Sequence, residues 1–278
     1  MYKHLGKSLV TLTIVLFACS IFVHASFAAE TVNVAGSTTV LPLAEATAEE
    51  YNAEHPDIRV SVTGGGSGVG IKNIADGISD IGIASREVTS DEKSRYGDKF
   101  QENLVGYDGI AVAVSKQIYD TGVTSLTKDQ VKKIYSGEID NWNELGGPND
   151  EIYVVAREQG SGTRDTFNED IMGDRKAETP GVDTVEMSSA GIKTAITGSD
   201  KAIGYLGFSY VQDNKVGVLT VEGVKPTTET IKDGSYALSR KLYFYTFGDA
   251  KSAAQEYIDY VVGSEGQIIV EENGFIPL

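Results

Sequence analysis

Three segments of the chain combine glycine with short hydroxyl side chains, and each follows a run of residues typical of a β-strand. Glycine lets the backbone approach a ligand closely, and serine and threonine hydroxyls donate hydrogen bonds over a range of angles. This pattern favours an anion that carries several oxygen atoms. The segments are Gly36-Ser37-Thr38-Thr39, Gly64-Gly65-Gly66-Ser67-Gly68 and Gly160-Ser161-Gly162-Thr163-Arg164.

Two arginines flank the hydroxyl groups of the third segment, Arg157 before them and Arg164 after them. A guanidinium group is a planar fork that matches two oxygen atoms at once, which strengthens the case for an oxyanion. The nucleotide-binding pattern G-x-x-x-x-G-K-S/T occurs nowhere in the sequence, which argues against a nucleoside triphosphate site. Each segment alone is also typical of a plain helix start, because serine and threonine are common N-cap residues.

The elements that must position these segments are short β-branched runs alternating with helical stretches. This alternation predicts an α/β fold with mostly parallel sheets. A helix that begins after a strand presents unpaired N–H groups at the carboxyl end of the sheet, where ligands bind. We expect strands at 32–34, 59–63, 81–84, 104–115, 152–156, 203–206 and 241–247, and helices at 41–52, 68–76, 92–100, 128–136, 162–171, 189–197, 250–262 and 265–272.

The composition narrows the class of protein. With 278 residues, 41% of them hydrophobic, the chain can bury one large core or two medium ones. It has 24 lysine and arginine residues against 40 acidic ones, and this excess of negative charge argues against nucleic acid as a partner.

Residues 1–28 have the features of a secretory signal. Lys3 and Lys7 precede an apolar run that ends in small residues. We expect cleavage after Ala28 and a protein secreted across the cytoplasmic membrane, periplasmic or at the cell surface. Cys19 leaves open a lipoprotein site, and an uncleaved membrane anchor is the remaining alternative.

Loss of residues 1–28 leaves His55 as the only histidine and removes the only cysteine. Disulfides, cysteine nucleophiles and Cys/His zinc sites are therefore not expected, and neither a metal nor a cofactor is predicted. A Ser-His-Asp triad would need His55, which lies in a polar turn after a predicted helix.

Further motifs occur in a fixed order with the three glycine-hydroxyl segments. They are Ile81-Gly82-Ile83-Ala84-Ser85-Arg86, Tyr107-Asp108-Gly109-Ile110-Ala111-Val112 and the closing run 265–278. Together the motifs resemble the phosphate-binding proteins of ABC-type phosphate importers, over about residues 31–278. The resemblance implies a two-lobed periplasmic-binding-protein-like fold of type II, in which each lobe is a mixed sheet flanked by helices and the ligand binds in the interlobe cleft.

We expect the two lobes to be joined by crossing strands. The candidate crossings are Tyr107–Gly109 and Phe208–Val211. Lobe 1 would then comprise residues 29–107 plus 210–278, and lobe 2 residues 108–209.

The resemblance also implies which residues hold phosphate. Hydroxyl groups of the three segments would donate to phosphate oxygens, helped by the backbone amides of Thr38, Gly68 and Gly162. Arg157 would be the charged partner, and Arg164 is a second candidate. The full expected binding set is Ser37, Thr38, Thr39, Ser67, Gly68, Arg86, Asp108, Arg157, Ser161, Gly162, Thr163 and Arg164.

One position departs from the family pattern. Some members carry an acidic residue where Arg86 stands here, and that residue accepts the proton of hydrogen phosphate. Asp108 is the expected substitute, with a plain turn role before Gly109 as the alternative. Arg86 would either contact the ligand or neutralise Asp108.

The predicted function is capture of inorganic phosphate and its delivery to the membrane permease of an ABC importer, by a protein that acts as a monomer. Sulfate, molybdate or tungstate is the alternative ligand. A secreted phosphatase with Ser161 or Ser67 as nucleophile is the alternative class, against which the missing histidine base and metal ligands weigh.

Overall fold

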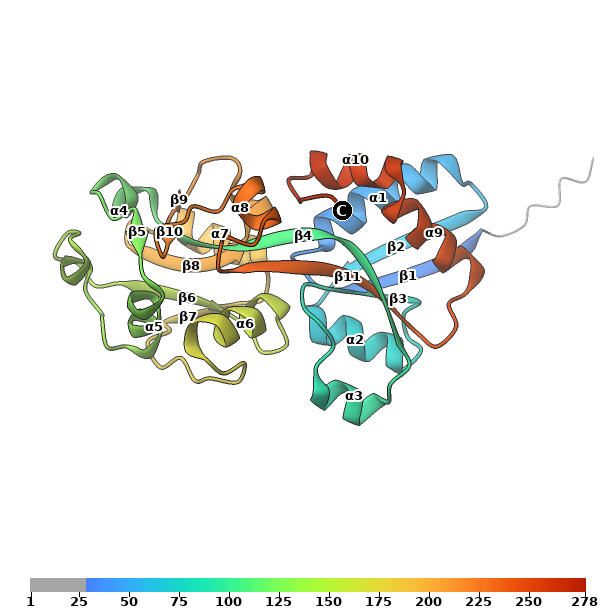
Figure 1. Ribbon diagram of the computed structural model, residues 1–278, viewed down its shortest axis with the longest axis horizontal. Helices are drawn as coiled ribbons and strands as arrows, with labels where there is room; N and C mark the ends of the chain where they lie inside the picture. Colours follow the sequence, from blue (N-terminus) through green and yellow to red (C-terminus); the bar gives the residue numbers. More distant parts are fainter. Residues whose placement is uncertain (1–28) are drawn as a thin grey trace, which may run out of the picture.

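The computed structural model describes residues 29–278, which form two lobes side by side (Figure 1). Two long strands join the lobes: β4 (Phe100–Val114) and β11 (Ser239–Phe247). The expected signal cleavage and the lipoprotein alternative at Cys19 fall outside the described residues. In the described part of the chain, no helix is both long and apolar enough to cross a membrane.

Lobe 1 has the strand order β2-β1-β3-β11-β4. β1 (Glu30–Gly36) pairs in parallel with β2 (Ile58–Gly64) and with β3 (Ile81–Ala84). The edge strand β2 alternates buried and exposed residues at its start, whereas β3 is buried throughout because helices cover both faces of the sheet. One face carries α1 (Leu41–Glu54), α9 (Ser252–Val262) and α10 (Ser264–Glu272), and the other carries α2 (Ser67–Ala75) and α3 (Ser90–Tyr96) (Figure 1).

Lobe 2 continues the same sheet from the second half of β4. β4 pairs there with β8 (Ala202–Gly207), which is followed by β6 (Tyr153–Arg157) and β7 (Thr184–Glu186). The remaining elements are β5 (Ser125–Leu126), β9 (Gly217–Val218), β10 (Thr220–Val221), α4 (Lys116–Asp120), α5 (Lys128–Ser136), α6 (Gly162–Phe167), α7 (Ser189–Thr197), α8 (Thr228–Lys232), the 3-10 helices η1 (Trp142–Leu145) and η3 (Phe208–Val211), and a π-helical turn, η2 (Asn168–Met172).

The structure divides the chain between the lobes differently from the expected boundaries. β4 changes partner from β11 to β8 between Gly109 and Ile110, next to the first expected crossing. The segment at 208–211 is a 3-10 helix instead of a crossing strand. Residues 212–238 stay with lobe 2, because β9 pairs with the end of β4, β10 pairs with β5, and the apolar side chains of this segment pack in the lobe 2 core.

The second crossing is therefore the start of β11 at Ser239. We call residues 29–109 and 239–278 lobe 1, and residues 110–238 lobe 2.

The sheet is mixed, as the family resemblance implies, and less parallel than the alternation of strands and helices alone predicts. β4 and β11 run antiparallel to each other and to β8 and β3, respectively. This follows from the topology, since a chain that enters lobe 2 along one strand must return along another. The predicted helix at 92–100 begins earlier, at Ser90, because Thr89 and Glu92 form a capping box, and it ends before Gly97.

Phe167 at the end of α6 is a packing centre of lobe 2. Its ring stacks on Tyr205 with 3.9 Å between centroids and meets Tyr135 edge-on at 4.8 Å. The Tyr205 hydroxyl in turn accepts a hydrogen bond from the backbone N–H of Arg157 at 3.2 Å. This aromatic cluster therefore supports the loop that carries the third glycine-hydroxyl segment.

Substituting Phe167→Ala should lower the free energy of unfolding by about 3–5 kcal/mol, because it removes a fully buried ring and leaves a cavity. Denaturant unfolding monitored by circular dichroism measures this change. The control Val185→Ala alters an exposed side chain on β7 and should change stability by less than about 0.5 kcal/mol. Equal effects of the two substitutions would contradict the packing role.

Candidate functional site

The three glycine-hydroxyl segments meet between the lobes. Two of them follow β1 and β2 of lobe 1 and lead into α1 and α2, and the third follows β6 of lobe 2 and leads into α6. Ser37, Ser67 and Ser161 are each at most 2% exposed. The Gly68 N–H donates to the Gly160 carbonyl oxygen at 3.0 Å, which joins the second segment to the third across the lobes.

The serine hydroxyls of these segments all accept hydrogen bonds from backbone N–H groups. Ser37 Oγ accepts from the Thr39 amide at 3.3 Å, Ser67 Oγ from the Ser85 amide at 3.2 Å, and Ser161 Oγ from the Arg164 amide at 3.3 Å. A hydroxyl that accepts an N–H still has its own proton to donate. Helix capping by Ser161 and hydrogen-bond donation to an anion are therefore compatible.

Threonine hydroxyls from both lobes lie beside these serines. Thr39 Oγ1 of lobe 1 is 2.8 Å from Thr163 Oγ1 of lobe 2 and 3.2 Å from Ser189 Oγ. The Tyr210 hydroxyl donates to the Thr38 carbonyl oxygen at 2.6 Å, and burial raises the pKa of this phenol, so it stays a donor. Oxygen atoms of the two lobes are thus in direct hydrogen-bond contact.

Arg157 lies within this group of hydroxyls and is 2% exposed. Its Nη2 donates to Thr38 Oγ1 at 3.0 Å, and its Nη1 donates to Ser189 Oγ at 3.2 Å. The neighbouring Glu158 accepts from Nε and Nη2 at 2.8 and 2.9 Å. Arg164 is only partly buried and lies in the first turn of α6.

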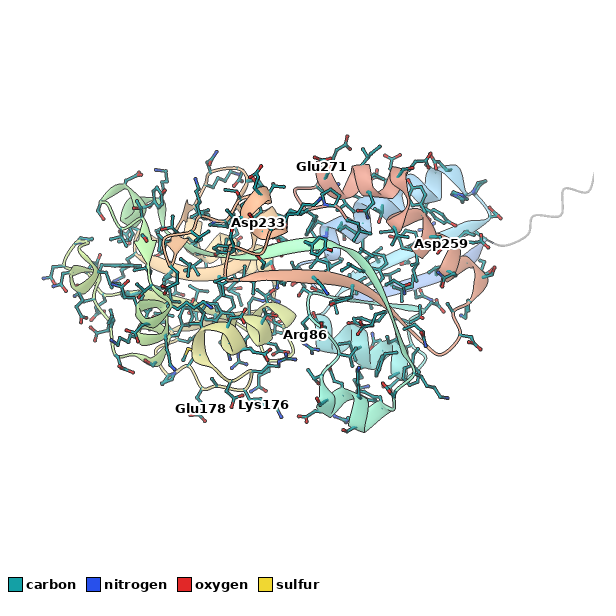
Figure 2. The ribbon with its side chains drawn as sticks, viewed as in Figure 1. Arg86, Lys176, Glu178, Asp233, Asp259 and Glu271 are labelled. Atoms are coloured by element: carbon teal, nitrogen blue, oxygen red, sulfur yellow. The ribbon has the colours of Figure 1, made fainter. Side chains whose placement is uncertain are left out.

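Arg86 does not neutralise Asp108, so one of its two expected roles is wrong. Glu92 accepts from its Nη1 and Nη2 at 2.8 and 2.9 Å, and Asp165 of lobe 2 accepts from its Nε at 2.7 Å. Figure 2 shows Arg86 between the two lobes. Burial lowers the pKa of Arg86, but Glu92 and Asp165 outweigh this and hold the pKa above its ordinary value. Ligand contact by Arg86 stays a prediction.

Asp108 is neutralised by Arg240, a residue that the sequence analysis did not single out. Arg240 Nε and Nη2 donate to Asp108 Oδ2 at 3.1 and 2.6 Å, and the Phe208 amide donates to Oδ1 at 3.1 Å. Burial lowers the pKa of the Arg240 guanidinium, and Asp108 opposes this shift. Asp108 is fully buried and is therefore more than an exposed turn residue before Gly109.

The expected side chains meet between the lobes except for Arg164, which is only partly buried, and Arg86, whose donors are engaged by Glu92 and Asp165. Ser189 follows the same pattern as the three segments, because it begins a helix after a strand, and that pattern would have found it. Arg240 lies inside a strand with no local signal, so only strand pairing reveals it. The missed residues in contact with the expected set include Ser85, Glu92, Glu158, Asp165, Ser189, Phe208, Tyr210 and Arg240.

A comparison with family models matches residues 23–265 to the PBP superfamily domain. Among curated proteins, the chain is 36% identical to the phosphate-binding protein PstS of Bacillus subtilis (strain 168) over 253 residues, which cover 90% of this chain and 82% of that protein. The chain belongs to the PstS family within the PBP superfamily. A second PstS protein, from Staphylococcus saprophyticus, is 33% identical and covers 87% of this chain and 79% of its own length.

Solved structures agree with this family assignment. A Clostridium perfringens protein, described as a substrate-binding protein of a phosphate ABC transporter with bound phosphate, superposes with a TM-score of 0.83 at 39% identity, covering 90% of this chain and all of that one. An ABC-type phosphate transport receptor from Vibrio cholerae superposes with a TM-score of 0.73 at 31% identity, covering 89% of this chain and all of that one. The expected two-lobed α/β fold is confirmed.

Gly162 of lobe 2 packs tightly against lobe 1. A Cβ atom there would come within 2.3 Å of Ser67 Oγ and 2.7 Å of Ser85 Oγ, both in lobe 1. Both distances are shorter than any van der Waals contact, so a side chain at this position would hold the lobes apart.

Substituting Gly162→Ala should weaken phosphate binding about 10- to 100-fold, because overpacking of a tight contact costs about 1–3 kcal/mol. Isothermal titration calorimetry with inorganic phosphate measures the affinity. The control Gly198→Ala, exposed at the end of α7, approaches only backbone oxygen atoms of α7 itself and should bind phosphate like the unmodified protein. Unchanged affinity of Gly162→Ala would show that closure does not need this contact.

Proposed function

We propose that the protein captures inorganic phosphate, as hydrogen phosphate, outside the cytoplasm and delivers it to the permease of an ABC importer. The observation that carries this proposal is the convergence of buried hydroxyls from both lobes: Arg157 donates to Thr38 of lobe 1 and to Ser189 of lobe 2, and Thr39 of lobe 1 meets Thr163 of lobe 2. Relatives that match most of the chain are phosphate-binding PstS proteins. Partners would be phosphate and the permease, with the protein acting as a monomer.

Each arginine of the site is paired with an acidic residue, so the site has little net positive charge. Phosphate would therefore be held mainly by hydrogen bonds. Arg157 is paired with Glu158, and Arg240 with Asp108. A phosphate ion would therefore meet polar groups of nearly balanced charge, chiefly hydroxyls and the expected backbone amides of Thr38 and Gly162. In a closed, dry site such hydrogen bonds are stronger than in water. The Gly68 amide, expected among the donors, is engaged with Gly160 instead.

Asp108 supplies the acceptor for the proton that distinguishes phosphate from sulfate. Its carboxylate has about four acceptor positions, and three are used by Arg240 and the Phe208 amide. The remaining position on Oδ1 can accept the P–O–H proton. Sulfate carries no proton near neutral pH, so the carboxylate would face a bare anionic oxygen and repel it.

The unmodified protein should bind phosphate at least about 1,000-fold more tightly than sulfate. Sites built to hydrogen-bond a ligand proton reject an analogue that lacks it by about 10,000- to 100,000-fold. Asp108→Asn should narrow that ratio, because an amide can donate to a bare oxygen. Calorimetric titration of both anions measures it, with Asp129→Asn, a change at an exposed aspartate, as the control. Equal affinities of the unmodified protein for phosphate and sulfate would rule out the role given to Asp108.

The same site supports capture without hydrolysis. A serine nucleophile needs a base. His55 is the only histidine among residues 29–278, and it lies at the end of α1 that is far from Ser37. That helix spans 14 residues, so the imidazole is about 20 Å from the hydroxyls. His55 instead stacks on Tyr51, with 4.0 Å between ring centroids.

No turnover of a chromogenic phosphate monoester should be measurable above the uncatalysed rate. Ser161→Ala should weaken phosphate binding about tenfold, the value of one hydrogen bond to a charged group, without changing that background rate. Absorbance assays over several hours test this. A hydrolysis rate that falls with Ser161→Ala would instead identify Ser161 as a nucleophile and the protein as a phosphatase.

A further inference from the structure

Arg240 lies directly opposite Asp108 in the pairing of β11 with β4. These are the two strands that join the lobes, and both side chains are buried, Arg240 at 7% and Asp108 at 0% exposure. Two donor atoms of the guanidinium bind one carboxylate oxygen of Asp108. Because both backbones are held by strand pairing, the guanidinium has a fixed place at the strands that join the lobes.

The same guanidinium reaches one hydroxyl in each lobe. Its Nη1 donates to Thr163 Oγ1 of lobe 2 at 2.9 Å, and its Nη2 lies 3.5 Å from Thr39 Oγ1 of lobe 1. The two threonine oxygens are themselves 2.8 Å apart. These three contacts can exist together only when the lobes are closed.

The polarity of these contacts orients the hydroxyls. A guanidinium group only donates, so the oxygens of Thr163 and Thr39 accept from Arg240. Arg157 donates in the same way to Ser189, which lies 3.2 Å from Thr39. Linked hydrogen bonds polarise one another, so a hydroxyl that accepts from an arginine becomes a better donor. Thr39, Thr163 and Ser189 each have one hydroxyl proton, and their two mutual contacts use two of these, so one proton is left to donate to an anion.

We propose that Arg240 is a positioning residue for anion capture: held by Asp108, it orients the linked hydroxyls of Thr39 and Thr163 so that one of them can donate to the anion, and it couples lobe closure to the bound anion. This inference rests on the proposed function and deepens it, because it assigns a role in affinity to a residue on the joining strands. It also separates two roles, since Asp108 selects the protonated anion whereas Arg240 sets the geometry for any tetrahedral oxyanion.

Arg240→Gln should weaken phosphate binding about 10- to 100-fold, the value of hydrogen bonds to a charged group. Small-angle X-ray scattering should then show no contraction at a phosphate concentration that contracts the unmodified protein. Arg240→Lys keeps the charge but loses the planar fork, so it should recover only part of the affinity. The matched control, Arg95→Gln, changes an exposed arginine on α3 and should alter neither measurement.

A double-mutant cycle separates positioning from a purely structural role. Phosphate affinity is measured for Arg240→Gln, for Thr163→Val and for the two together. If Arg240 acts through the Thr163 hydroxyl, its substitution should cost several-fold less once that hydroxyl is gone. Additive losses would show that Arg240 supports the fold without orienting Thr163, which overturns the proposal.

Arg240→Gln leaves Asp108 buried without its cation and can prevent folding. Arg240→Lys keeps a cation beside Asp108 and leaves Asp108 itself unchanged, and thermal unfolding without phosphate confirms that it folds. It should bind phosphate more weakly than the unmodified protein and contract less at the same phosphate concentration. If the folded variants bind phosphate and contract like the unmodified protein, this inference alone is overturned. If the unmodified protein fails to bind phosphate, the proposed function and this inference are both overturned.

Discussion

Buried polar groups between two lobes must find hydrogen-bond partners, and the arrangement of the molecule follows from that requirement. Hydroxyls, carboxylates and guanidinium groups that are almost completely buried meet in one place, where an unpartnered group would be costly. Arg157 and Arg240 each satisfy an acidic neighbour and still reach hydroxyls of the binding group. Neither lobe alone could satisfy the set, because Thr38 and Thr39 are in lobe 1 while Arg157 and Thr163 are in lobe 2.

Local sequence patterns predicted much of this arrangement. β3, α5 and α7 have the predicted bounds, because buried runs and helix caps are local signals. The three glycine-hydroxyl segments lie where the alternation of strands and helices places them, at the carboxyl ends of strands. The motif resemblance gave the family and the two-lobed fold, which the comparisons confirm.

The rest depends on pairing between residues far apart in the chain. Residues 212–238 contain only short strands and turns, so nothing local shows that they pack in lobe 2. Arg240 and Asp108 are more than a hundred positions apart in the sequence, and only the register of β11 on β4 makes them neighbours. The contact of Arg86 with Asp165 of the other lobe likewise depends on the fold, whereas its contact with Glu92, six positions along the chain, is local.

The two ion pairs of Arg86 differ in their number of hydrogen bonds, and this difference affects how the lobes separate. Glu92 belongs to the same lobe as Arg86 and holds it with two bonds, whereas Asp165 contributes one bond from the opposite lobe. When the lobes separate, Arg86 keeps its counter-ion and Asp165 becomes free to be hydrated. Separation of the lobes therefore leaves neither Arg86 nor Asp165 buried without a partner. The electrostatic free-energy cost of opening at this ion pair is small for that reason.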